Sequence, residues 1–223
     1  MKAVFTCGGT GGHINPALAV TRGLLERRPD SEILFVGAED GMEATLVPRE
    51  GFRLETLQIS SYMRSLKPSA IRHNVRAALS IRRALKKADR IIRDFQPDVI
   101  LGTGGYASYP MLHEGARLGI PTAVHESNAV PGLATKMVAD KVDRILVSFA
   151  DSRSAYRDPS RVIAVGMPVR EEFVFTRRAD ARRALGLNEK TPMIVSAWGS
   201  LGAREMNKKI AQFMKLECEQ DCW

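Results

Sequence analysis

The fold is decided by an N-terminal stretch that reads KAVFTCGGTGGHINPALA over residues 2–19. Apart from Lys2, residues 2–7 are β-branched, aromatic or other apolar residues, which favours a short strand, and the glycine-rich segment 8–12 ends it. Apolar residues then recur at helical spacing, with Asn15 as the expected N-cap and Pro16 as the expected first helical residue. The stretch therefore predicts a strand, a glycine loop and a helix in succession.

The same order recurs further along the chain. The apolar run 98–101 leads into the glycine-rich segment 102–106, and the run 193–197 predicts a strand before the glycine turn 199–202. Further strands are expected at 33–36, 121–125, 144–148 and 161–165, and helices at 70–95, 132–139 and 203–216. Strands that alternate with helices are typical of an α/β fold with a parallel sheet covered on both faces.

The C-terminal part predicts a second domain. Residues 176–192 are rich in charge and indicate an interdomain connection or a surface helix. One strand and one helix cannot bury both faces of a sheet. We therefore expect residues 1–170 to form one Rossmann-like domain, and residues 171–223 to form a linker and the first β/α unit of a second, truncated domain.

Composition narrows the class of protein. The chain has 223 residues, 44% of them hydrophobic, which is sufficient for a globular core and argues against disorder. Its three cysteines are too few for a disulfide framework, which favours a reducing cytoplasm. The sequence shows no cluster with metal-ligand spacing, no signal peptide and no apolar stretch long enough to span a membrane. We expect no metal site and no cofactor.

The positive charge is concentrated in one segment. The formal net charge is +8, yet residues 62–93 alone contain ten basic side chains and one acidic one. A basic amphipathic helix of this kind suits an anionic membrane surface, where each basic residue contributes about 1 kcal/mol. The alternative is an ordinary covering helix with a solvated charged face. A nucleic-acid-binding module would use the same helix, but we expect no nucleic-acid partner.

The glycine loops suit an anion. A glycine loop between a strand and a helix presents backbone N–H groups beside the positive end of a helix dipole, where a diphosphate can bind. Residues 8–12 match neither the dinucleotide fingerprint nor the P-loop. The alternative is that the glycines only permit tight turns and close packing of the helix.

Two groups of polar residues are candidates for chemistry. His13 follows the first glycine loop, where a helix N-terminus disfavours the imidazolium, so a neutral ring can accept a proton there; the alternative is a simple hydrogen-bonding residue. Glu126 and Asn128 follow an expected strand, at the edge where open α/β sheets bind ligands. They can hold sugar hydroxyls or an acetamido group, or they can form a capping and turn cluster before the next helix.

The order of the motifs resembles that of one enzyme family over essentially the whole chain. The motifs are GGTGGHINPALA at 8–19, GGY at 104–106, HESNA at 125–129 followed by GL at 132–133, PVR at 168–170 and GSLGAR at 199–204. They are similar to those of the bacterial UDP-N-acetylglucosamine:lipid I N-acetylglucosaminyltransferases of peptidoglycan synthesis. The chain departs from the family pattern at Tyr109, Met167 and Trp198.

The resemblance implies a fold and an activity. Members are hexosyltransferases of the GT-B type, in which two Rossmann-like domains face each other and the N-terminal one binds the acceptor. They transfer N-acetylglucosamine from UDP-N-acetylglucosamine, with inversion, to the C4 hydroxyl of the N-acetylmuramoyl sugar of lipid I, giving lipid II. They act at the cytoplasmic face of the cell membrane as peripheral proteins. By this resemblance, the segments that bind uracil and ribose are expected beyond Trp223.

The resemblance also assigns roles to residues. It makes His13 the candidate general base. It implies acceptor and diphosphate contacts at Gly8, Gly9, Gly104, Gly105, Tyr106 and Glu126. It implies contacts with the sugar nucleotide at Thr10, Gly11, Gly12, Asn128, Arg170 and Ser200.

Two other functions stay open at this point. The first is a fragment that binds the lipid acceptor without catalysis. The second is a nicotinamide-dependent oxidoreductase domain, which would use the first glycine loop together with Glu39 or Asp40, although the glycine spacing argues against it.

Overall fold

A computed structural model describes residues 1–59, 68–190, 192–198 and 204–220, with side chains except at 68–79 and 219–220. The chain divides into two compact units, Met1–Arg170 and Glu171–Trp223. The acceptor-binding and sugar-donor-binding roles expected for residues 1–170 and 171–223 stay predictions.

The first unit contains a seven-stranded sheet in the order β3-β2-β1-β4-β5-β6-β7, and every neighbouring pair is parallel. The strands are β1 (Lys2–Thr6), β2 (Glu32–Ala38), β3 (Arg53–Leu57), β4 (Val99–Gly102), β5 (Thr122–Glu126), β6 (Arg144–Val147) and β7 (Val162–Ala164). The predicted parallel α/β sheet is confirmed. The strand order reverses at β1, which pairs with β2 on one edge and β4 on the other. Ligands bind at such a switch point in open α/β sheets.

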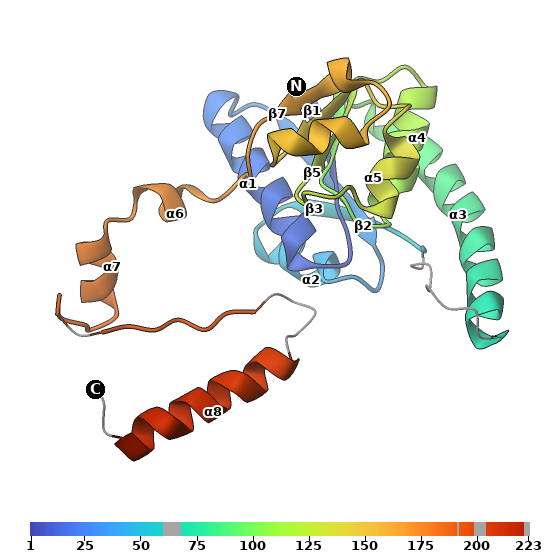
Figure 1. Cartoon of the computed structure of the whole chain (residues 1–223). Coiled ribbons are helices and arrows are strands. Elements are labelled where there is room, and N and C mark those ends of the chain that lie inside the picture. The colour runs from blue at the N-terminus through green and yellow to red at the C-terminus, as the bar shows by residue number, and fades with distance from the viewer. Residues whose placement is uncertain (60–67, 191, 199–203, 221–223) are drawn as a thin grey trace. The chain divides into compact units, whose positions relative to one another are not determined.

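Helices cover both faces of this sheet (Figure 1). They are α1 (Gly11–Arg27), α2 (Glu43–Arg49), α3 (Pro68–Phe95), α4 (Ser108–Arg117) and α5 (Leu133–Val138), with two short 3₁₀ helices, η1 (Ala150–Ala155) and η2 (Pro159–Arg161). Side chains of a strand alternate between faces, so Val4 and Phe5 of β1 enter different cores. Phe5 packs with Ile14 of α1 and Val47 of α2, whereas Val4 belongs to the core that contains Met111 of α4.

Helix α1 begins earlier than predicted. The carbonyl of Thr10 accepts hydrogen bonds from the N–H groups of His13 at 3.0 Å and Ile14 at 3.2 Å, so the helix starts at Gly11. Asn15 and Pro16 therefore lie inside the helix, so Asn15 is not its N-cap and Pro16 is not its first residue. The prediction was wrong because the glycine-rich backbone already turns into helical geometry before the first apolar residue.

The second unit contains α6 (Glu171–Phe175), α7 (Arg178–Ala184) and α8 (Arg204–Gln220). Helix α8 confirms the helix expected at 203–216. The strand expected at 193–197 is wrong, because residues 192–198 are neither helix nor strand. The described part of this unit contains no strand that can supply hydrogen-bonding partners to such a segment. The glycine turn 199–202 lies outside the described residues.

Candidate functional site

The two glycine loops of the first unit meet at the carboxyl ends of β1 and β4. A Cβ atom on Gly105, which has φ of +81°, would lie 2.1 Å from the carbonyl oxygen of Gly8. A Cβ atom on Gly104, which has φ of +99°, would lie 2.8 Å from Cδ2 of His13. These two glycines are therefore required by the close approach of one loop to the other.

His13 is held in one orientation by the loops. Its Nδ1 lies 2.9 Å from the carbonyl oxygen of Gly8, and because a carbonyl only accepts, Nδ1 must donate. The hydroxyl of Thr103 donates to the backbone carbonyl of His13 at 2.6 Å. In the neutral ring the lone pair is therefore on Nε2, which has no hydrogen-bond partner among the described residues.

A cavity of about 240 Å³ brings together residues from three of the predicted motifs, at 8–19, 104–106 and 125–133. His13, both glycines of the second loop and the loop after β5 supply its polar side, while α3, α4 and α5 supply an apolar side. Lining residues on the polar side include His13, Gly104, Gly105, Tyr106, Glu126 and Asn128, and on the apolar side Ile59, Ile81, Tyr109, Leu133 and Met137. A mostly apolar cavity with a few convergent polar groups is typical of a small-molecule site.

Tyr106 lines this cavity, and its phenol can donate a hydrogen bond. Burial, together with the charges of Glu43 and Asp40, raises the pKa of its phenol, which therefore stays protonated at neutral pH. Its ring lies against Gly9, where a Cβ atom would be 3.3 Å from Cε1 of Tyr106. Gly9 has φ of +89°, so the glycine provides both this conformation and the space for the ring.

Glu126 binds its own loop. It is 4% exposed, and its Oε1 accepts from the backbone N–H of Asn128 at 2.9 Å and from its side-chain amide at 2.7 Å. Oε2 accepts from the N–H of Gly132 at 2.9 Å. Burial raises the pKa of Glu126, but hydrogen bonds from Thr135, Asn128 and Gly132 outweigh it and lower the pKa. The carboxylate therefore orients Asn128 at the cavity, and a direct ligand contact by Glu126 stays a prediction.

His125 connects β5 with the segment after β7. It is 1% exposed, and its Nε2 donates to the carbonyl oxygen of Gly166 at 3.0 Å. Burial lowers the pKa of His125, while the contacts with Gly166 and Glu126 act in the opposite direction. Its buried Nδ1 has no hydrogen-bond partner in the described part of the chain. This arrangement favours a neutral imidazole at His125, whose hydrogen bond to Gly166 fixes the start of the loop after β5.

The first glycine loop leaves N–H groups open at the start of α1. The first N–H groups of a helix have no partner within it, and those of Thr10, Gly11 and Gly12 have none elsewhere in the described ranges. By contrast, the N–H of Gly9 donates to Oε2 of Glu43 at 3.1 Å. The anion-binding potential predicted for this loop therefore resides at residues 10–12. Sequence reasoning missed Glu43, for which it offered no local signal.

Several predicted contact residues are not among the described residues that line the cavity: Gly8, Gly9, Thr10, Gly11, Gly12 and Arg170. Arg170 is the last residue of the first unit. Ser200 lies outside the described residues. The sugar-nucleotide contacts expected from these two side chains are therefore untested.

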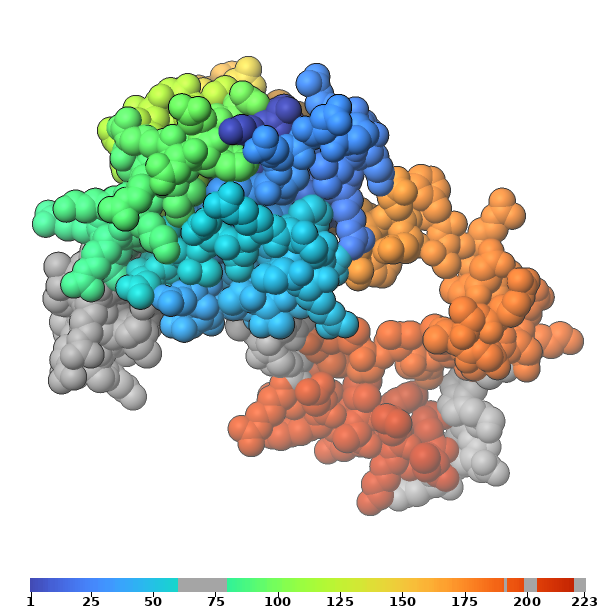
Figure 2. All heavy atoms as spheres, turned by 180° about the vertical axis from the view of Figure 1, so that it is seen from behind, coloured from blue at the N-terminus to red at the C-terminus, as the bar shows by residue number. Residues whose placement is uncertain are grey.

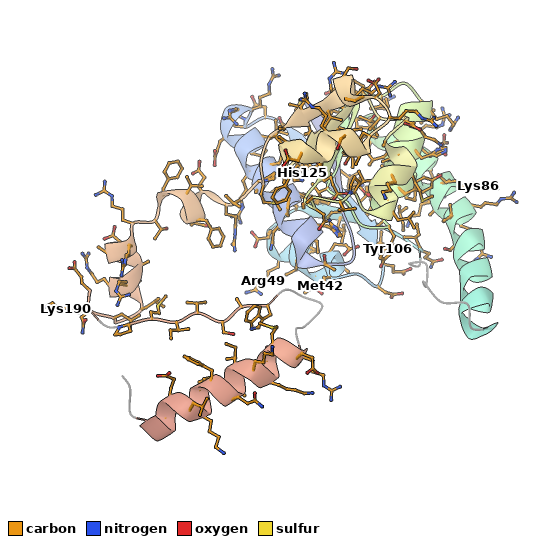
Figure 3. The ribbon with its side chains drawn as sticks, viewed as in Figure 1. Met42, Arg49, Lys86, Tyr106, His125 and Lys190 are labelled. Atoms are coloured by element: carbon orange, nitrogen blue, oxygen red, sulfur yellow. The ribbon has the colours of Figure 1, made fainter. Side chains whose placement is uncertain are left out.

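The basic segment predicted at 62–93 is described in part. Its residues 62–67 lie outside the described residues, and the rest belongs to α3, which runs beside α4 (Figure 1). Arg93 pairs with Asp89 at 2.8 Å. Five other basic side chains are exposed and make no ion pair with any described residue: Arg82, Arg83, Lys86, Lys87 and Arg90. Ala84, Ala88, Ile91 and Ile92 of α3 are buried in the core, whereas Lys86 points away from the helix in Figure 3. Figure 2 shows the described part of α3 from the opposite side.

Within the described ranges, no three His, Cys, Asp or Glu side chains gather closely enough to hold a metal ion. Among the same residues, no helix combines the length and apolar character that crossing a membrane requires.

The first unit has the features of a Rossmann-like ligand-binding domain. It combines a parallel sheet with a switch point, two glycine loops in close contact, and a cavity beside these loops. Residues 3–147 match the family described as "Glycosyltransferase family 28 N-terminal domain", and the chain belongs to this family.

Two curated relatives carry the same name. The "UDP-N-acetylglucosamine--N-acetylmuramyl-(pentapeptide) pyrophosphoryl-undecaprenol N-acetylglucosamine transferase" of Acetivibrio thermocellus is 40% identical over 215 residues, which are 96% of this chain and 57% of that protein. The protein of the same name from Clostridioides difficile is 33% identical over 99% of this chain and 54% of its own length. The chain thus spans a little over half the length of these curated relatives.

Solved structures agree with the fold. The crystal structure of Acinetobacter baumannii MurG has a TM-score of 0.60 and 25% identity, covering 77% of this chain and 47% of that one. UDP-GlcNAc 2-epimerase from Neisseria meningitidis, solved with bound UDP-GlcNAc, has a TM-score of 0.54 at 15% identity and covers 75% of this chain and 46% of its own. The second likeness shows the fold alone.

Proposed function

We propose that this chain is the acceptor-binding part of a transferase that moves N-acetylglucosamine from UDP-N-acetylglucosamine to the C4 hydroxyl of the N-acetylmuramoyl sugar of lipid I, producing lipid II. The names of the relatives support the proposal. The observation that carries it is the cavity in which the open Nε2 of His13 lies beside the second glycine loop. A sugar hydroxyl, a diphosphate and an apolar chain all find suitable surroundings there.

In the proposed reaction, His13 is the general base. The C4 oxygen of the acceptor attacks the anomeric carbon of N-acetylglucosamine, and the bond from that carbon to UDP breaks, with its electron pair leaving on the diphosphate. The hydroxyl proton goes to Nε2 of His13. General-base catalysis of this kind contributes about 10²–10⁴-fold to a rate. Attack from the face opposite UDP inverts the anomeric configuration.

Backbone and side-chain donors neutralise the phosphates in this proposal. The acceptor diphosphate binds the loops that contain Gly8, Gly9, Gly104 and Gly105, with Tyr106 donating its phenolic hydrogen. The sugar nucleotide contacts Thr10, Gly11, Gly12, Asn128, Arg170 and Ser200. A guanidinium such as that of Arg170 can hold a diphosphate oxygen and offset the charge of the leaving group.

A transferase assay with UDP-N-acetylglucosamine and a short-chain lipid I analogue tests this function. In a transferase that contains both this acceptor-binding part and the sugar-donor-binding part, His13→Gln is expected to lower kcat about 10²–10⁴-fold with little change in the KM for the acceptor. Binding of the analogue without turnover by the unmodified chain would favour the alternative of a non-catalytic acceptor-binding fragment. Failure of the unmodified chain to bind the analogue would refute the proposal.

We further propose that α3 binds an anionic membrane surface at the cytoplasmic face of the cell membrane. The five unpaired basic side chains of α3 support this, and Ile81 of the same helix lines the apolar side of the cavity. A lipid chain entering the cavity from the membrane would therefore pass along α3. Sedimentation with phosphatidylglycerol vesicles should exceed sedimentation with phosphatidylcholine vesicles and decline with salt. Equal sedimentation with both would contradict the proposal, and tighter binding to duplex DNA than to vesicles would favour a nucleic-acid partner.

A further inference from the structure

A carboxyl group is enclosed beneath the first glycine loop. Glu43, the first residue of α2, is 0% exposed. Glycines surround it: a Cβ atom on Gly37 would lie 2.3 Å from its Cγ, and one on Gly41 would lie 2.3 Å from its Cδ. On the loop itself, a Cβ atom on Gly8 would lie 3.0 Å from its Oε1. Glycine at these three positions therefore leaves the space that the carboxyl group of Glu43 occupies.

The carboxyl group joins two backbone segments. Its Oε1 accepts from the N–H of Ala38, at the end of β2, at 2.7 Å, and its Oε2 accepts from the N–H of Gly9 at 3.1 Å. No ion pair connects Glu43 to any cationic side chain that the structure describes. A buried acid without a cation is costly unless hydrogen bonds satisfy it. These two N–H groups are therefore what stabilise it in this position.

The position of this acid is unexpected for an anion site. A negative charge beneath the loop opposes a bound diphosphate, and its influence already reaches Tyr106, whose pKa is raised by burial and by Glu43. It also removes the N–H of Gly9 from the groups that can bind a ligand. The compensating effect is geometric, because the bond fixes Gly9 at φ of +89° with the ring of Tyr106 against it.

We propose that Glu43 is the positioning residue of the acceptor diphosphate site. By holding the N–H of Gly9 inward, it turns the N–H groups of Thr10, Gly11 and Gly12 toward the ligand and seats Tyr106 at the cavity. Gly9 then supports the site without donating to the ligand. This inference rests on the proposed function and revises its contacts. The N–H groups of Thr10, Gly11 and Gly12, assigned above to the sugar nucleotide, bind the acceptor diphosphate, and the N–H of Gly9, which donates to Glu43, does not.

The variant Glu43→Gln separates positioning from charge. Glutamine has the same size, but its NH₂ group must face either the N–H of Ala38 or that of Gly9, so one hydrogen bond is lost. If the charge alone mattered, removing it would tighten diphosphate binding. We expect the Kd for a short-chain lipid I analogue to rise about 10-fold, as the loss of one such bond implies. Glu39→Gln, at an exposed neighbouring acid, is the matched control and should leave the Kd unchanged.

A second measurement needs no variant. Amide hydrogen exchange of the unmodified chain should show Gly9 protected without ligand, and Gly11 and Gly12 unprotected until inorganic pyrophosphate or the lipid I analogue is added. Equal, fast exchange at Gly9 and Gly11 in the free protein would overturn the inference. An unchanged or lower Kd in a folded Glu43→Gln variant would also overturn it. If the unmodified chain fails to bind the analogue, the proposed function fails first.

Discussion

Two apolar runs of this chain have similar sequences and different outcomes. The run in β1 lies between two parallel strands, and Val4 and Phe5 are 0% and 2% exposed. The run at 193–197 forms no strand, and Ile194 and Val195 are 62% and 70% exposed. A strand needs neighbours to satisfy its backbone and helices to cover its side chains. The comparison shows that an apolar run becomes a strand only where the rest of the unit supplies both.

The largest difference between the two units should appear in the free energy of unfolding after loss of an aromatic ring. Phe35 is buried and stacks on Phe5 with ring centroids 5.5 Å apart. Phe35→Ala should destabilise the chain by about 3–5 kcal/mol in urea unfolding followed by circular dichroism. Phe175→Ala, at a ring that is 72% exposed in the second unit, should change it by less than about 0.5 kcal/mol. An equal loss for both variants would contradict the comparison.

Substitution of a glycine in each unit should give an intermediate loss of stability. Gly105 of the first unit and Gly186 of the second both have positive φ, of +81° and +69°. Alanine at either position should lose about 1 kcal/mol from backbone strain. In Gly105→Ala alone, the new Cβ atom also collides with the carbonyl oxygen of Gly8, which should cause a further loss of about 1–3 kcal/mol in stability. Thermal unfolding of both variants checks this, and equal shifts in Tm would mean that the loops are not in contact.

The smallest of the three effects concerns a carboxylate. In Glu126→Gln, the NH₂ group must face an N–H of Asn128 or of Gly132, so about 1–3 kcal/mol of stability should be lost at pH 7. Glu205→Gln, on an exposed turn of α8, should give no measurable change. Urea unfolding of both variants measures the difference.

The effect of Glu126 should also depend on pH. The pKa of Glu126 is lowered in the folded state, so its stabilising contribution is present above the ordinary pKa of 4.5 and is lost as the pH falls through the folded-state value. The difference in unfolding free energy between the unmodified chain and Glu126→Gln should therefore shrink on acidification. A difference that stays constant between pH 7 and pH 3 would show that the charge of Glu126 is not what the loop requires.

Local patterns predicted the centre of the sheet and its edge strand β7, but not the opposite edge strand β3. The strand at 2–7 and the loop at 8–12 were predictable because a buried parallel strand is a continuous apolar run ended by glycine. Strand β3 (Arg53–Leu57) was not predicted, since Arg53 and Glu55 make it polar and it lies at the edge of the sheet. Edge strands carry such charges because one side faces solvent.

The cavity was predictable in part for a similar reason. His13, Tyr106 and Asn128 each follow a strand, and the carboxyl ends of parallel strands share one edge of the sheet. Glu43 escaped prediction because its role depends on Gly9, 34 residues earlier in the chain. Only the folded backbone brings those two groups together.

The hydrogen bond from Nδ1 of His13 to the carbonyl oxygen of Gly8 restricts proton transfer by this imidazole to its other nitrogen, Nε2. With Nδ1 tied to the backbone, the imidazole cannot pass a proton through the ring to the far side, so it is no relay. A proton gained at Nε2 must leave from Nε2, into the same cavity that it came from. Under the proposed chemistry, Nε2 of His13 loses its proton only after the product has left the cavity and water has entered. Deprotonation of the imidazole would therefore be coupled to product release.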